Sequence, residues 1–362
     1  MLIYLLLLFF IIFLRQYQIT CRAVLNAEHK LVKSEESGDK LFLFVSFGLI
    51  ILLTALRSEN VGPDTRQYIG HFNRICNDVY YRLDEQFESG YWLLTVAVSK
   101  ITYNEQIFLL VIALMTNIPI ALFINKYSRN KLLSVVLYIT VGAFTFQLTG
   151  LRQSIAMAIC IMAIDYSLQR KLLPFLFLTV LASFFHRSAI LFLPVYLVGT
   201  PILNRRNIIL IVASFIFVTF ADIFISNLSM LLSYGEYLGT AGVEDTGGWT
   251  VIAIMLISLV LYLFTKKSGS LGEREDNNDR FFFILLLWAL SLYWIRYQMR
   301  AAERVSLYYR CALLILLPNT LDRLQNKNLR TLLNSACIVL AILLFFYWLQ
   351  GSAYIYTPFW AP

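Results

Sequence analysis

The stretch LFLFVSFGLIILLTAL, residues 41–56, decides the class of fold, because it holds no charged residue and is almost long enough to cross a bilayer. The rest of the chain resembles it in composition. Hydrophobic residues make up 59% of the 362 residues and charged residues only 14%, whereas soluble domains carry about 25% charged residues. Lipid must be the solvent for most of this chain, and we expect an all-α, polytopic integral membrane protein.

A helix that crosses the hydrocarbon core needs about 20 apolar residues, and this measure predicts about 10–12 transmembrane helices. The candidate spans are 2–19, 41–56, 105–124, 132–148, 152–168, 172–185, 188–199, 207–226, 249–265, 281–297, 306–320 and 331–349. The pair 172–185 and 188–199 is short, which is typical of a re-entrant or tilted hairpin. A helix over 90–102 is too short to span and is expected at the membrane surface. The first segment lacks a basic n-region, so we expect a retained span rather than a signal peptide.

The loops predict both the domain organisation and the orientation. We expect a single multi-span domain over residues 1–362, in which the outer loops are 57–104 and 227–248 and the cytoplasmic loops are 20–40 and 266–280. Loops rich in Lys and Arg stay on the cytoplasmic side. This assignment puts most of the 30 basic residues inside the cell.

The basic residues left on the predicted outer face are arginines, except for Lys100. The planar guanidinium binds phosphate or carboxylate through two parallel hydrogen bonds, which the ammonium of lysine cannot do. The outer face is therefore expected to hold anions. The alternative is that these arginines lie along the membrane interface and extend their charged ends into water.

Four short motifs on the predicted outer face carry the candidate site residues. They are RSENVGPDTRQY (57–68), GLRQSIA (150–156), FFHRSA (184–189) and ERVSLYYR (303–310). In the first motif we expect Arg57 to emerge at the lipid headgroups, Gly62-Pro63 to turn the chain, and Tyr68 to follow Asp64 by one helical turn. Arg152 and Arg304 are each expected at the start of a helix. Ionisable groups at membrane depth are costly and usually face a cavity. For His186 the alternative is a turn residue bonded to a carbonyl group, and for Asp64 it is an ion pair with Arg66 that caps the loop.

The same motifs carry a resemblance to a known family. In the order LRSENVGPDTRQY, GLRQSIA, ASFFHRSAILF and RVSLYY…LLP, they extend over residues 56–318 and resemble the EpsG family of polysaccharide polymerases, a branch of the Wzy-type O-antigen polymerases. The loop 227–248 shows no such resemblance. The resemblance implies a metal-independent glycosyltransferase that joins repeat units of O-antigen, capsule or exopolysaccharide. These units are carried on undecaprenyl pyrophosphate at the outer, periplasmic or exterior face of the bacterial cytoplasmic (inner) membrane.

Roles for the candidate residues follow from this resemblance and from their chemistry. His186 and Asp64 are the candidate bases for the acceptor hydroxyl. The residues expected to bind pyrophosphate or sugar are Arg57, Arg66, Tyr68, Arg152, Gln153, Arg187, Arg304 and Tyr308. No metal or other cofactor is expected. The expected partners are the undecaprenyl-pyrophosphate-linked oligosaccharide, membrane lipid and a chain-length regulator protein, but not nucleic acid.

Three other functions share parts of this pattern. Another lipid-linked glycosyltransferase would carry an acidic residue in its first outer loop, commonly with further acidic residues for a metal. An O-antigen ligase would share the arginines and the acceptor chemistry. A polysaccharide flippase or transporter would show inverted repeats with broken helices, and no paired pattern of that kind is present in the sequence.

Overall fold

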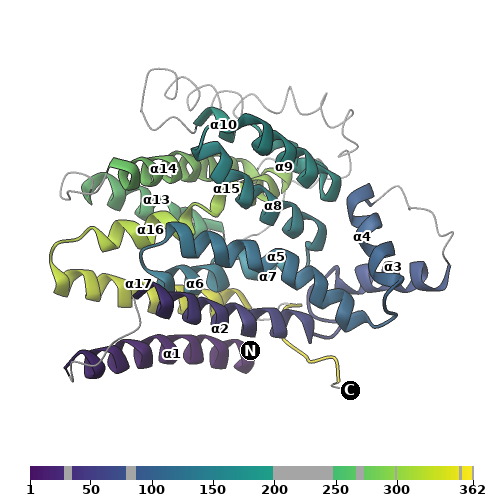
Figure 1. Cartoon of the computed structure of the whole chain (residues 1–362), viewed down its shortest axis with the longest axis horizontal. Helices are drawn as coiled ribbons and strands as arrows, with labels where there is room; N and C mark the ends of the chain where they lie inside the picture. The colour runs from purple at the N-terminus through teal and green to yellow at the C-terminus, as the bar shows by residue number, and fades with distance from the viewer. Residues whose placement is uncertain are drawn as a thin grey trace. The chain divides into compact units, whose positions relative to one another are not determined.

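The structure is a computed structural model that describes residues 1–27, 35–78, 87–198, 248–265, 273–297, 300–349 and 353–360. The described part consists of helices and their connections (Figure 1). Extended backbone pairs there in one isolated bridge, between Arg57 and Pro358. The all-α prediction is therefore confirmed.

Six of the described helices are long and apolar enough to cross a membrane, as expected of a polytopic protein. They are α1 (Leu2–Ala27), α2 (Glu35–Ala55), α5 (Glu105–Tyr127), α8 (Leu151–Leu168), α13 (Gly248–Thr265) and α17 (Lys327–Leu349). Each covers a predicted span. Helices α1, α2 and α17 extend past the apolar residues, because helical hydrogen bonds continue into polar sequence whereas hydropathy marks only the part in lipid. The predicted loop 20–40 is shortened accordingly.

Two predicted spans are each divided between two helices. Span 132–148 consists of α6 (Lys131–Thr140) and α7 (Ala143–Gln147), which are separated at Gly142, where φ is 88°. A left-handed residue interrupts an α-helix, and glycine adopts that conformation at little cost. Span 306–320 falls across α15 (Arg300–Arg310) and α16 (Leu313–Asp322). Hydropathy alone gives no sign of either break.

The remaining predicted segments have mixed outcomes. Segment 172–185 is helical, as α9 (Leu172–Phe185), but it is shorter than the six long helices. Segment 188–199 begins as the 3₁₀ helix η1 (Arg187–Phe192) and continues as the single turn α10 (Val195–Val198). Span 281–297 is covered by α14 (Glu273–Trp294) and η3 (Ile295–Tyr297), so the loop 266–280 ends earlier than expected. Span 207–226 lies outside the described residues, as does the loop 227–248 apart from Gly248.

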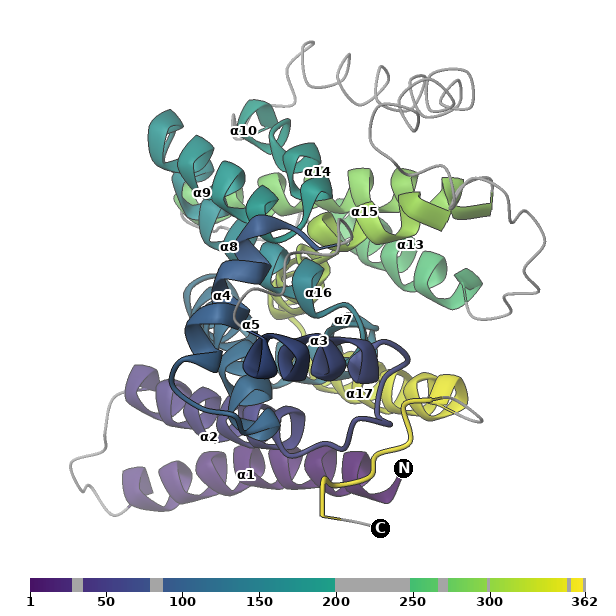
Figure 2. The same ribbon diagram turned by 90° about the vertical axis from the view of Figure 1, so that its right-hand side faces the viewer.

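The chain packs as two compact units, and the first comprises residues 1–162, 181–187 and 335–362. In it α2 packs against α1 and α5 (Figures 1 and 2). The predicted outer loop 57–104 contains two helices, α3 (Thr65–Asn77) and the expected short helix, α4 (Ser89–Ser99). One hydrophobic cluster joins α3, α4, α5 and α8. Its buried members include Tyr68, Phe72, Tyr91, Phe108 and Leu151.

The second unit comprises residues 163–180 and 188–334, in which α14 packs against α13, α15 and α16. A buried polar cluster joins α14 to the end of α16. Arg323 forms an ion pair of 2.7 Å with Asp279, and Asn319 donates a hydrogen bond of 2.7 Å to the same carboxylate. The organisation as one multi-span domain stays a prediction beside this division into two units.

Candidate functional site

The site begins at the turn after α2, where Gly62 and Pro63 were predicted to redirect the chain. Gly62 has φ of 90°, and a Cβ atom at this position would lie 2.1 Å from the carbonyl oxygen of Leu148. The Thr65 hydroxyl donates to the same oxygen at 2.8 Å. Only glycine permits this backbone and this close approach. The turn is thereby fixed against the segment that leads into α8.

Asp64 and Tyr68 follow this turn as predicted, one helical turn apart. The Asp64 carbonyl accepts from the Tyr68 amide at 3.2 Å, and its carboxylate accepts from the Thr149 hydroxyl at 3.0 Å. Tyr68 is buried in the cluster of α3, α4, α5 and α8. Burial raises the pKa of Tyr68, and the nearby charge of Arg152 opposes that rise, so the phenol stays protonated at neutral pH.

Arg152 lies at the start of α8, as predicted, and is held on three sides. Its guanidinium carbon lies 4.8 Å from the ring centre of Phe87, and its Nε donates to the Tyr68 hydroxyl at 3.4 Å. Its Nη1 forms an ion pair with Oε2 of Glu88. Aromatic, hydroxyl and carboxylate contacts together leave the guanidinium little freedom to reorient.

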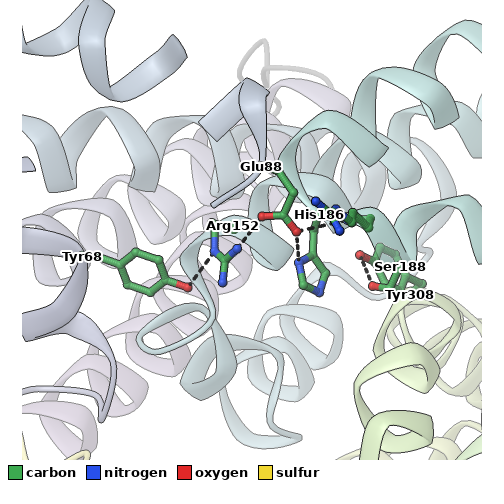
Figure 3. A network of polar contacts seen from close by, with 7 residues as sticks. Tyr68, Glu88, Arg152, His186, Ser188 and Tyr308 are labelled. Atoms are coloured by element: carbon green, nitrogen blue, oxygen red, sulfur yellow. Dashed lines mark hydrogen bonds and ion pairs between the residues drawn. The ribbon is translucent and has the colours of Figure 1, made fainter. Parts of the chain in front are cut away.

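Glu88 is the centre of the site, and it immediately precedes α4 (Figure 3). Its side chain is only 10% exposed. Besides the ion pair with Arg152, its Oε1 faces Nδ1 of His186 at 3.0 Å and accepts from the backbone amide of Arg187 at 3.3 Å. Burial would raise the pKa of Glu88, but the hydrogen bond from His186 and the charge of Arg152 outweigh it and lower the pKa to about 2.

The contact between Glu88 and His186 depends on a close approach of the two backbones. His186 follows the last residue of α9, and its amide still donates to Ala182 at 3.0 Å. Gly90, in the first turn of α4, lies against Phe184. A Cβ atom on Gly90 would be 2.7 Å from the carbonyl oxygen of Phe184. Glycine at this position allows α4 to begin close to the end of α9.

The negative charge of Glu88 determines which ring nitrogen of His186 carries the hydrogen. An ionised carboxylate only accepts hydrogen bonds, so Nδ1 of His186 carries the hydrogen in this pair. In the neutral ring Nε2 then carries a lone pair, and Figure 3 shows this nitrogen turned away from Glu88. Within the described residues, His186 contacts no polar partner through Nε2. The arrangement can take a proton at Nε2 while Glu88 stabilises the resulting imidazolium.

Three other predicted site residues in this unit have different environments. Arg187 has an exposed side chain, and its backbone amide belongs to the site. Gln153 is buried in α8 beside Arg152. Arg66 is exposed and forms an ion pair of 3.2 Å with Glu59. The alternative ion pair between Asp64 and Arg66 is therefore wrong, because the side chain of Arg66 turns back along the loop instead.

Arg57 differs most from its expected environment. It was predicted to emerge at the lipid headgroups as a pyrophosphate ligand, but its side chain is fully buried. The cause is the C-terminal tail, which we define as residues 353–360. The backbone of Arg57 pairs with that of Pro358 in this tail.

Arg304 and Tyr308 belong to the second unit, on α15. This helix begins at residue 300 rather than 303, so Arg304 lies inside it instead of at its start, and its side chain is exposed. Tyr308 is buried, and its hydroxyl lies 3.1 Å from Oγ of Ser188. That Arg304 and Tyr308 share a site with Arg152 stays a prediction.

Sequence reasoning missed Glu88 as a functional residue. It looked like one of several scattered acidic residues in the first outer loop, and it stands outside the four motifs. One local signal was present, because an acidic residue near the start of a helix interacts favourably with the helix dipole. That signal predicts a helix start and not a partner for Arg152 or His186.

Comparison with known proteins agrees with this description. The chain has no significant match among the curated proteins or among the solved structures. The family model described as "EpsG family" matches residues 40–361, which include most of α2, the whole of the site around Glu88, the helices of the second unit and the C-terminal tail. The protein is a polytopic membrane protein of the EpsG family.

Proposed function

We propose that this protein is a Wzy-type polysaccharide polymerase of the outer face of the bacterial cytoplasmic membrane. It transfers a growing glycan from undecaprenyl pyrophosphate to a sugar hydroxyl of another lipid-linked repeat unit. Membership of the EpsG family supports a role in polysaccharide biosynthesis. The observation that carries the proposal is the partly buried chain of contacts from Arg152 through Glu88 to His186.

The acceptor hydroxyl is activated by His186 in this proposal. Its Nε2 takes the hydroxyl proton as the oxygen attacks the anomeric carbon of the donor sugar. Glu88 keeps the imidazole in the required tautomer and stabilises the imidazolium, and Arg152 holds Glu88 in place. Asp64 is the weaker candidate for this role, because its carboxylate is already bonded to Thr149.

The donor side of the reaction needs positive charge. As the new glycosidic bond forms, the bond between the anomeric carbon and the phosphate oxygen breaks, and its electron pair leaves on the pyrophosphate. Positive groups fixed in advance stabilise such a leaving group most effectively. Arg152 is held in this way, and Arg187 adds an exposed guanidinium next to His186.

The net charge of the site supports a base at His186 beside positive groups that face the leaving pyrophosphate. With a neutral imidazole, the side chains of Glu88, Arg152 and Arg187 together carry one positive charge. Transfer of the acceptor proton to His186 adds a second positive charge. That charge arises at the same moment as the negative charge on the leaving pyrophosphate, which favours the transition state over the bound substrates.

The test uses the purified chain in lipid nanodiscs with one synthetic substrate, an undecaprenyl-pyrophosphate-linked repeat unit. Because this substrate is both donor and acceptor, a ladder of lengthening products defines a polymerase. A ligase or a flippase would give no ladder. We expect the ladder to persist in EDTA and to be lost in His186→Ala, while the control Lys327→Gln, at an exposed position, retains it. Loss of the ladder in EDTA would favour the metal-dependent alternative.

A further inference from the structure

The C-terminal tail lies across the segment that follows α2. Two backbone hydrogen bonds join the tail to Leu56, which follows the last residue of α2, and to Ser58, which follows Arg57. The amide of Ser58 donates to Thr357 at 2.8 Å, and that of Phe359 donates to Leu56 at 2.9 Å. A third bond of 2.9 Å runs from the Gly62 amide to Ala353. The tail therefore covers the whole stretch from the end of α2 to the turn at Gly62.

Arg57 is enclosed beneath this tail, and no described residue serves as its counterion. Its Nη1 donates to the carbonyl of Thr54, but Nε and Nη2 are buried and have no hydrogen-bond partner in the described part of the chain. Among the described residues, the titratable side chains that act on it are Tyr4 and Tyr356, which are neutral phenols. Burial lowers the pKa of Arg57 to about 10, so the guanidinium stays charged at neutral pH.

A buried charge in this state is strongly unfavourable unless an opposite charge accompanies it. Within the described residues no carboxylate forms an ion pair with Arg57. The two unbonded nitrogens, Nε and Nη2, lie on one edge of the guanidinium. That edge matches two oxygens of a phosphate group. Among the described residues, the charge of Arg57 is therefore left unbalanced, with one edge of the guanidinium suited to an anion.

The location indicates which anions can reach this arginine. The apolar span of α2 ends at Ala55, only two residues earlier. Beside it the tail exposes Ile355, Phe359 and Trp360, with exposed fractions of 48%, 47% and 65%. Exposed aromatic residues next to the end of a span are typical of the membrane–water interface. Phosphate groups of lipids occupy the same depth.

We propose that Arg57 binds a lipid phosphate at the membrane interface and that the C-terminal tail closes over it. Both a phospholipid headgroup and the pyrophosphate of a lipid-linked saccharide offer this chemistry. The inference rests on the unpaired charge at Arg57 and not on the proposed reaction at His186. The lipid site at Arg57 and the proposed reaction at His186 can therefore be disproved independently.

The experiment compares lipids with and without phosphate on the full chain in detergent. Thermal unfolding and native mass spectrometry are recorded with phosphatidylglycerol against diacylglycerol, and with undecaprenyl pyrophosphate against undecaprenol. We expect the phosphate-bearing lipid of at least one pair to raise the melting temperature by a few degrees and to remain bound, because it binds only the folded state. A response to phosphatidylglycerol identifies a headgroup site. A response to undecaprenyl pyrophosphate alone identifies a donor site.

Two variants decide whether Arg57 is responsible. Arg57→Met should lose the lipid-dependent shift, yet melt no lower than wild type without lipid, because it removes an unpaired buried charge. Arg57→Lys keeps the positive charge but lacks the planar guanidinium that can donate two parallel hydrogen bonds. It should bind the phosphate lipid several-fold more weakly. Equal lipid-dependent shifts in wild type and Arg57→Met overturn the proposal. If Arg57→Met does not fold, the other measurements still decide. The proposal is overturned if Arg57→Lys binds the phosphate lipid as tightly as wild type does. It is also overturned if wild type prefers neither phosphate-bearing lipid over its phosphate-free partner.

Discussion

Oε1 of Glu88 lies 3.0 Å from Nδ1 of His186, and this contact joins the residue before α4 to the residue after α9. The partner of Glu88 on its other oxygen is Arg152, at the start of a third helix. Three segments that are far apart in the sequence therefore meet at one carboxylate (Figure 3).

The acid stability of the protein should depend on Glu88. Its pKa falls from an ordinary 4.5 to about 2 on folding. A lowered pKa stabilises the folded state above the ordinary value, and this stabilisation is lost as the pH falls towards the folded value. Between about pH 4.5 and about pH 2, we expect the melting temperature to drop more steeply in wild type than in Glu88→Gln. The control Glu36→Gln, at an exposed position, should follow wild type. Parallel curves for wild type and Glu88→Gln would contradict the assignment.

The polymerisation rate should be more sensitive to the charge of Glu88 than to its shape. Glu88→Gln keeps a hydrogen-bonding side chain of the same size but can no longer stabilise an imidazolium. We expect a loss of about 100-fold or more in rate, by analogy with other acid-oriented histidines. Binding of the lipid-linked donor should change much less. A rate within about twofold of wild type would mean that His186 works without this partner.

The two candidate bases can be separated by their variants. His186→Ala should abolish chain growth while donor binding remains, because the variant has no imidazole to take the acceptor proton. Asp64→Asn should lower the rate of chain growth less, because it alters a contact with Thr149 rather than the group that takes the proton. Single-turnover rates of wild type and the two variants provide the measurement. An unchanged rate in His186→Ala rules the histidine out.

Arg152 should not be replaceable by lysine. Arg152→Lys keeps the positive charge but loses the planar fork that stacks over Phe87 and reaches both Tyr68 and Glu88. We expect most polymerisation to be lost while the protein still folds, as judged by size-exclusion chromatography and thermal unfolding. Lys40→Arg is the control for the opposite exchange at an exposed position. Wild-type chain lengths in Arg152→Lys would instead indicate simple anchoring at the membrane interface.

The glycine at position 90 should matter although it carries no functional group. Gly90→Ala would place a Cβ atom 2.7 Å from the carbonyl oxygen of Phe184, so α4 must move away from the end of α9. We expect reduced polymerisation through a weakened contact between Glu88 and His186. Gly70→Ala is a matched control, because nothing lies within 4 Å of its Cβ position in α3. Alanine there should stabilise the helix by roughly 0.5–1 kcal/mol. Equal activity of the two variants would show that the approach of α4 to α9 is unimportant.

Several features of this protein were fixed by local sequence. The apolar stretches predicted the six long helices, because the free energy of placing a helix in lipid is nearly a sum over its own residues. The start of α8 beside Arg152, the turn at Gly62 and the position of Tyr68 one helical turn after Asp64 were also predictable. Each of these depends on backbone preferences within a few residues.

The tertiary structure alone decided which charges are paired. No local pattern indicates that Glu88 pairs with Arg152 and His186, or that Arg66 pairs with Glu59 and not with Asp64. Likewise nothing in residues 57–68 indicates that the C-terminal tail covers Arg57. The strength of an ion pair, and the cost of a buried charge, depend on distance and on exclusion of water. Both quantities are set by the packing of segments that are remote in the sequence, such as α4 against the end of α9.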